Sequence, residues 1–175
     1  MDASPLAGWE NFYVIVGSSA GGLTGLTFVV IALIRDMSKA TPAGVGAFVT
    51  PTIVHFGGVL AMAAFLSMPH QHLGTLSAGF AIAGVAGLIY SGFIVRGMRA
   101  QAPSYMPVWE DWAFNAIVPA LVYAGLVLVS GLLWRWTQPS LFAVAAMSLV
   151  MLFVGIHNAW DIAVWMTTRS APAKD

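Results

Sequence analysis

The sequence contains no cysteine. This absence excludes disulfide bonds, thiolate metal sites, iron–sulfur clusters and covalently attached c-type haem. No lysine lies within a long apolar stretch, which excludes a retinal Schiff base. The sequence also has no Ser/His/Asp, Walker or zincin motif, so it gives no indication of an enzyme.

Charged residues are scarce. They make up 8% of the 175 residues, against about 25% in a typical soluble domain. Apolar residues make up 59%, and seven basic and seven acidic side chains could not cover the surface of a soluble domain of this size. We therefore predict an integral membrane protein in contact with the lipid bilayer. The net charge of zero argues against a nucleic-acid partner.

The few charges separate long uncharged intervals. A membrane-spanning helix needs about 20 largely apolar residues. The interval from Lys39 to Arg96 is long enough for two helices, and Pro69 and Gly74 mark a break within it. Pro119 is a candidate kink in a later helix. The sequence predicts one all-α domain over residues 1–175, with five transmembrane helices at residues 12–34, 49–67, 74–95, 112–134 and 139–167.

Basic residues predict the orientation of these helices. Six of the seven fall on one side of the membrane: Arg35, Lys39, Arg96, Arg99, Arg169 and Lys174. Only Arg135 falls on the other side. Because cytoplasmic loops carry an excess of Lys and Arg, we expect the N-terminus outside and the C-terminus inside. The start of the chain lacks the basic segment of a cleaved signal peptide, so we expect the first helix to be retained.

Small residues recur every four positions in two of the predicted helices. Such stripes let helix backbones approach one another closely. The chain is small and has no internal repeat, so we also expect a homo-oligomer, in which some of these faces contact a second copy. The predicted packing residues are Gly17, Gly21 and Gly25 in the first helix and Gly79, Ala83 and Gly87 in the third.

The most informative residues are polar ones within the predicted spans. Asp161 is the only acid or base there, and His157 precedes it by one turn on the same helical face. A carboxylate at the bilayer centre costs about 2.5–3.5 kcal/mol on insertion scales, so it needs a reason to be there. Other polar side chains are predicted in the same cytoplasmic half, namely His55, Asn158, Asn115 and Tyr90.

Several interpretations of this cluster remain open. The polar groups could bond to one another and stabilise the bundle. They could relay protons or ions, which is the leading functional hypothesis. His55, His157 and Asp161 could bind a divalent metal, or the two histidines could hold haem b axially. A further alternative is a non-catalytic accessory subunit of a larger membrane complex.

The stretch GIHNAWD from Gly155 to Asp161, together with the Gly- and Ser-rich first span, resembles a group of small bacterial membrane proteins known only as hypothetical proteins. The resemblance implies a multi-pass protein of the bacterial inner membrane. It implies no activity.

Overall fold

The computed structural model describes residues 4–37, 42–101 and 108–169, and all regular structure in these ranges is helical. The π-helical segment η1 joins α4 to α5, so these three elements form one continuous helix from Trp109 to Leu132. The elements are α1 (Glu10–Met37), α2 (Pro42–Leu66), α3 (Leu73–Gln101), α4 (Trp109–Trp112), η1 (Ala113–Ile117), α5 (Val118–Leu132) and α6 (Thr137–Arg169).

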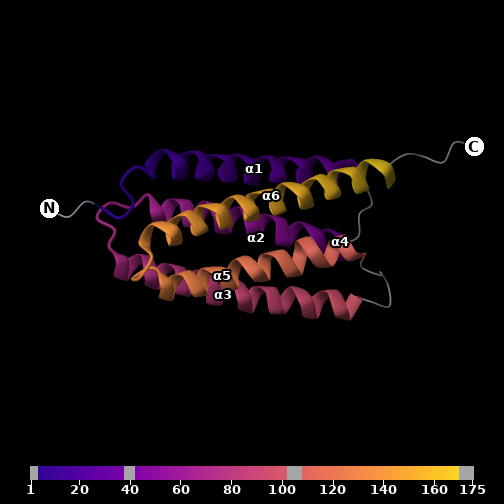
Figure 1. The fold of residues 1–175 in the computed structure, drawn as a ribbon. Coiled ribbons are helices and arrows are strands. Elements are labelled where there is room, and N and C mark those ends of the chain that lie inside the picture. The colour runs from indigo at the N-terminus through magenta and orange to yellow at the C-terminus, as the bar shows by residue number, and fades with distance from the viewer. Residues whose placement is uncertain (1–3, 38–41, 102–107, 170–175) are drawn as a thin grey trace, which may run out of the picture.

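Successive helices run in alternating directions, side by side (Figure 1). Within the described residues, four helices are long and apolar enough to cross a membrane: Glu10–Ala32, Leu73–Arg99, Trp109–Leu132 and Thr137–Val164. These four overlap the predicted spans 12–34, 74–95, 112–134 and 139–167. The predicted span 49–67 falls on α2, which contributes a shorter apolar stretch, Thr50–Leu66. The all-α prediction and the membrane character of the chain are thus supported by the fold.

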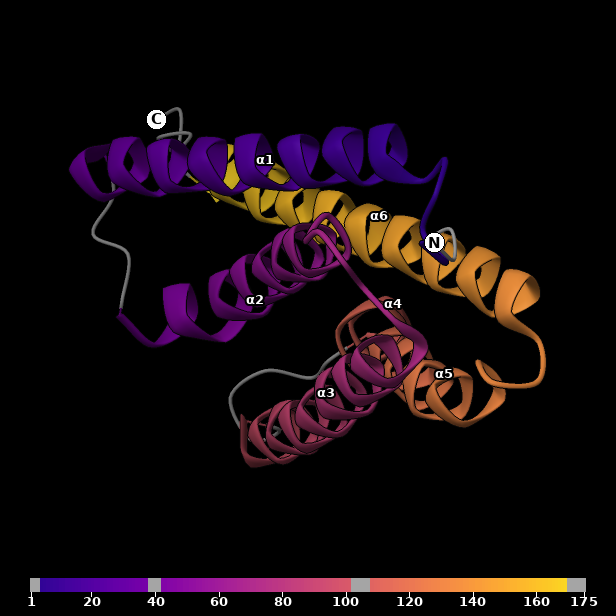
Figure 2. The ribbon, with the colours of Figure 1, turned by 90° about the vertical axis from the view of Figure 1, so that its left-hand side faces the viewer.

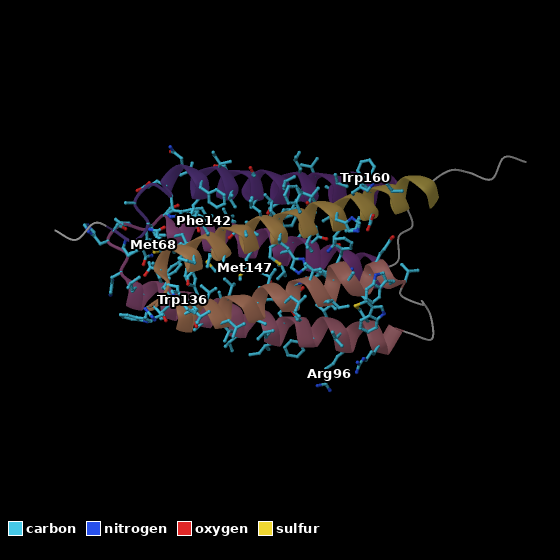
Figure 3. All side chains as sticks on the ribbon, in the orientation of Figure 1. Met68, Arg96, Trp136, Phe142, Met147 and Trp160 are labelled. Carbon is cyan, nitrogen blue, oxygen red and sulfur yellow. The ribbon has the colours of Figure 1, made fainter. Side chains whose placement is uncertain are left out.

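Exposed tryptophans lie at both ends of the bundle. Figure 3 shows Trp136 at one end and Trp160 near the other. Their side chains are 53% and 67% exposed. Trp160 follows Trp136 by 24 positions, which corresponds to about 36 Å of helix and is close to the thickness of a bilayer with part of its interfacial layers. This placement is typical of the aromatic belts of membrane proteins.

The helices form two pairs, α1 with α2 and α3 with α5, and α6 contacts both pairs. α1 packs on α2, α2 packs on α6, and α3 packs mainly on α5, which in turn contacts α6. Figure 2 shows α1, α2 and α6 on one side of the bundle and α3 with α5 on the other. Although α2 and α3 are consecutive, they contact each other little.

The buried core lies mostly toward the end of the bundle where α1 begins. The largest cluster of buried side chains comes from all the long helices and includes Leu76, Phe80, Leu133, Leu141 and Val144, each fully buried. A second cluster around Phe56 and Leu152 continues it toward the middle. One end of the bundle is therefore tightly filled with apolar side chains.

Glycines set the distances between helices. At four positions, a large side chain of the neighbouring helix occupies the space of the missing Cβ: Phe65 at Gly79, Tyr123 at Gly87, Met147 at Gly125 and Phe56 at Gly155. In α1, a Cβ at Gly17 would lie 3.0 Å from the Cβ of Ala63, whereas one at Gly25 would meet no atom within 4 Å. The glycines of the α3 stripe therefore pack against other helices of the same chain. In the α1 stripe, Gly17 does so and Gly25 does not.

α3 and α5 make the closest contact. A Cβ at Gly84 would lie 2.8 Å from the carbonyl oxygen of Tyr123 and 2.9 Å from the amide nitrogen of Val127. The hydroxyl of Ser77 also donates a 2.8 Å hydrogen bond to the carbonyl of Ser130 on α5. Van der Waals contact between backbones and one interhelical hydrogen bond therefore hold this pair together.

The loop between α2 and α3 is tied to both helices by Gln71. Its side-chain amide donates to the carbonyl oxygen of Phe65 at 2.7 Å, near the end of α2. Its side-chain oxygen accepts a 2.7 Å bond from the hydroxyl of Thr75 in the first turn of α3. The preceding residue, His70, has φ = 58°, in the left-handed region, which reverses the chain tightly. The two helices are thereby held together at this end.

Near Pro119, where the sequence predicts a kink, the structure has the π-helical segment η1. Proline has no amide hydrogen, and its ring clashes with the carbonyl four residues earlier, here that of Asn115. The chain widens by one residue before the proline, and the amide of Val118 bonds the carbonyl of Ala113, five residues back. Asn115 therefore lies within a π-helical turn.

We predict that Gly84→Ala destabilises the protein by about 1–3 kcal/mol, because the added Cβ meets backbone atoms that cannot rotate away. Gly92→Ala is the matched control, since a Cβ there meets no atom within 4 Å. Reversible unfolding in mixed micelles measures both. Equal stability of the two variants would contradict the close α3–α5 contact.

Candidate functional site

The six polar residues predicted as one cluster form two separate groups. Asn115, Asn158, His157 and Asp161 lie where α6 crosses η1. His55 and Tyr90 line a cleft whose other lining residues come from α2, α3, α5 and α6.

The first group centres on a hydrogen bond between two asparagines. Asn158 on α6 is buried, and its side-chain amide donates to the side-chain oxygen of Asn115 at 3.2 Å. The amide of Asn115 in turn donates to the carbonyl of Asp111 at 3.1 Å, within its own helix. The π-helical turn thus presents Asn115 to α6, and π-helical turns occur frequently at functional sites.

His157 lies beside this pair. Its ring stacks on Phe114 with 3.8 Å between centroids and 32° between planes. Its Nε2 atom lies 3.2 Å from Oδ2 of Asp161, one turn later. This approach is an ion pair when the imidazole is protonated, but it lacks the alignment of a hydrogen bond, so Nε2 has no hydrogen-bond partner among the residues that the structure describes.

The His157–Asp161 pair is open to the outside of the bundle. The side chain of Asp161 is 57% exposed and that of His157 is 33% exposed. Ionisable groups in membrane helices almost always face a protein interior or a polar cavity. Asp161 is exposed on the surface of a single copy, one residue after Trp160, and therefore lies at the level of the aromatic belt. Its neighbour Trp160 is the exposed tryptophan near the end of the bundle (Figure 3).

The second group lies in a cleft of about 490 Å³, which we call the α2–α3 cleft. Gly58 and Ala61 of α2 and Ile82 and Ala86 of α3 line it and are exposed, so it opens sideways between these two helices. Its floor includes Met147, which Figure 3 shows midway along the bundle. The volume is within the range of small-molecule sites, about 300–1,000 Å³.

Two polar atoms in this cleft are buried without partners. His55 is 1% exposed, and its Nδ1 atom has no hydrogen-bond partner among the described residues. The hydroxyl of Tyr90, on the facing helix, likewise has none. A buried polar group without a partner costs about 1–3 kcal/mol, and such groups are rare in folded proteins. The cleft is therefore apolar, and the two unpartnered atoms of His55 and Tyr90 lie buried behind its surface.

The predicted metal and haem sites are not assembled within one chain. The described residues contain no group of three His, Asp or Glu side chains that could hold a metal ion. His55 lines the α2–α3 cleft, whereas His157 does not and stacks on Phe114 instead. The two histidines therefore do not face each other across a cavity, as axial haem ligands must. The prediction compared the depth of the two histidines along their helices, and residue spacing does not show which neighbouring helix each histidine contacts.

Sequence reasoning missed several residues of both groups. Phe114 gives no signal as a stacking partner, because one phenylalanine in an apolar helix is ordinary. Tyr123, Met147 and Ser148 line the cleft, but their positions follow from how α5 and α6 pack. The glycine stripe in α3 was the available signal, since it predicts which face of that helix packs.

No family model, curated protein or solved structure matches this chain. The proposed function therefore rests on the two groups of polar residues described above and on the α2–α3 cleft.

We predict a measurable coupling between Asn115 and Asn158. In a double-mutant cycle with Asn115→Ala and Asn158→Ala, we expect a coupling of about 0.6–1.7 kcal/mol in the free energy of unfolding, the range found for hydrogen bonds between membrane helices. Asn11→Ala is the control, because Asn11 is exposed on α1. If the two substitutions have strictly additive effects on the free energy of unfolding, Asn115 and Asn158 do not contact each other, which would contradict the packing of α6 on η1.

Proposed function

We propose that this chain is a multi-pass protein of the bacterial inner membrane with five spans, its N-terminus outside and its C-terminus in the cytoplasm. α2 supplies the fifth span, since its 25 residues correspond to about 37 Å of helix, enough to cross a bilayer core. The ends of α1, α3 and α6 lie at one end of the bundle (Figure 1), and most basic residues lie near them in sequence. The resemblance of the GIHNAWD stretch supports the bacterial location.

We further propose that the protein binds a lipid-soluble small molecule in the α2–α3 cleft. The observation that carries this proposal is the apolar cleft of about 490 Å³ itself, which opens sideways between α2 and α3. In a membrane, such an opening faces lipid, so a ligand would enter from the bilayer. The protein would then serve a transport or redox system as its membrane-embedded binding component.

Ion or proton passage is a second candidate, and the exposure of the His157–Asp161 pair favours it. A route through one copy is disfavoured, because the largest buried cluster fills the end of the bundle where α1 begins with apolar side chains. A route between copies would bring the His157–Asp161 pairs of neighbouring copies into one polar interface. Gly25 and the exposed part of the α1 stripe are available for such contacts.

The binding proposal predicts a ligand that co-purifies with the protein. We expect organic extracts of the purified protein to contain one non-phospholipid molecule at near-stoichiometric amounts. Ala86→Phe should reduce it at least tenfold, because Ala86 lies at the mouth of the cleft. Ala78→Phe should leave it unchanged, because Ala78 is an exposed alanine of α3 outside the cleft. Equal amounts of ligand in both variants would contradict the proposal.

A further inference from the structure

The α2–α3 cleft is confined to the middle of the membrane-spanning helices. The apolar span of α3 runs from Leu73 to Arg99. The lining of the cleft begins at Gly79, about 9 Å of helix after the start of this span, and ends at Tyr90, about 14 Å before its end. Ala86, which is exposed at the mouth, lies thirteen residues from each end and is the central residue of the span.

α6 places the cleft at the same level. Its lining residues lie between Met147 and Met151, and its apolar span runs from Thr137 to Val164. The lining therefore begins about 15 Å of helix after one end of the span and stops about 20 Å before the other. Figure 3 shows Met147 midway along the bundle. Phospholipid head groups lie outside the apolar layer, so the cleft is out of their reach.

The polar groups around the cleft are few, and most are closed to a ligand. None of its described lining residues is Asp, Glu, Lys or Arg. The Nδ1 atom of His55 and the hydroxyl of Tyr90 are buried. The Ser148 hydroxyl donates to a carbonyl of its own helix at 2.9 Å, and Tyr123 supplies the remaining polar side chain. A polar head group that entered the cleft would be desolvated with little compensation.

From the depth of the cleft and its lack of open polar groups, and resting on the binding proposal above, we infer that the ligand is a free hydrocarbon. By this we mean a molecule without a polar head group, such as an isoprenoid hydrocarbon. Nothing anchors such a molecule at the membrane surface, so it dissolves in the middle of the bilayer and meets the mouth of the cleft there. A phospholipid tail reaches this depth only with its last carbons, whereas a free hydrocarbon can occupy the whole cleft.

The walls of the cleft suit such a guest. Gly58 and Ala61 on α2 and Ala86 on α3 are small and exposed, so they leave the mouth open to lipid. Met62 and Met147 line the interior. Methionine side chains adapt to the shape of a hydrocarbon because they are flexible and polarisable.

The elemental composition of the extracted molecule tests this inference directly. The molecule whose amount falls in Ala86→Phe, and does not fall in Ala78→Phe, should have an accurate mass that fits carbon and hydrogen alone. A molecule with the same dependence on Ala86 that contains oxygen, nitrogen or phosphorus would overturn the hydrocarbon and leave the binding proposal standing.

A matched pair of probes gives a second measurement on the full chain in lipid nanodiscs. Diphenylhexatriene is a fluorescent hydrocarbon, and its trimethylammonium derivative adds a charged head group. With the signal of empty nanodiscs subtracted, we expect saturable binding of the hydrocarbon. The derivative should bind more weakly by about tenfold or more, because a cation buried without a partner is unfavourable. Equal or tighter binding of the derivative would overturn the hydrocarbon alone.

Tyr123→Phe distinguishes a hydrocarbon from a polar ligand. The substitution removes only the hydroxyl, so diphenylhexatriene binding and the amount of extracted ligand should be unchanged. A ligand that bonds this hydroxyl would instead bind about three- to tenfold more weakly, and that result would overturn the hydrocarbon. If neither probe binds saturably and the extracts of Ala86→Phe and Ala78→Phe are equal, both this inference and the binding proposal are wrong.

Discussion

The arrangement of this bundle depends on how closely α3 can approach α5. Lipid tails are as apolar as leucine, so membrane helices gain little from apolar burial against one another and rely on close packing. At Gly84 the two backbones come within van der Waals contact, and at Gly87 the ring of Tyr123 occupies the space of a side chain. A side chain at either position would separate the helices. The absence of two Cβ atoms thus fixes where α3 lies.

The position of α3 determines the cleft. Because its small residues face α5, α3 is drawn away from α2, its neighbour in sequence, and touches it little beyond the end tied by Gln71. The space between them is bounded by α5 and α6 and contains His55 and Tyr90. The same packing that stabilises one helix pair leaves an open apolar cleft beside it. This is why we assign function to the cleft.

The all-helical fold and its long apolar helices could be predicted from the sequence, because hydrophobic length is a local property. The intervals between charges gave helices close to α1, α3 and α6, and Pro119 marked the position before which η1 forms. The candidate site was predicted less well. Asn158 and Asn115 do contact each other, but His55 and His157 lie in different groups. Residue spacing predicts how far along its helix a side chain lies, but it does not predict which neighbouring helix that side chain contacts. The cleft itself has no sequence signature, since it depends on the angle between two helices.

The function that we propose requires that α2 and α3 are separated by a cleft that opens into lipid. Spin labels at Ala61 and Ala86, one on each side of the mouth, test it most directly in lipid nanodiscs. We predict that both labels collide frequently with lipid-dissolved oxygen and rarely with a water-soluble nickel complex. Low accessibility to oxygen at both labels would show that the helices close on each other or on a second copy, and would contradict the account.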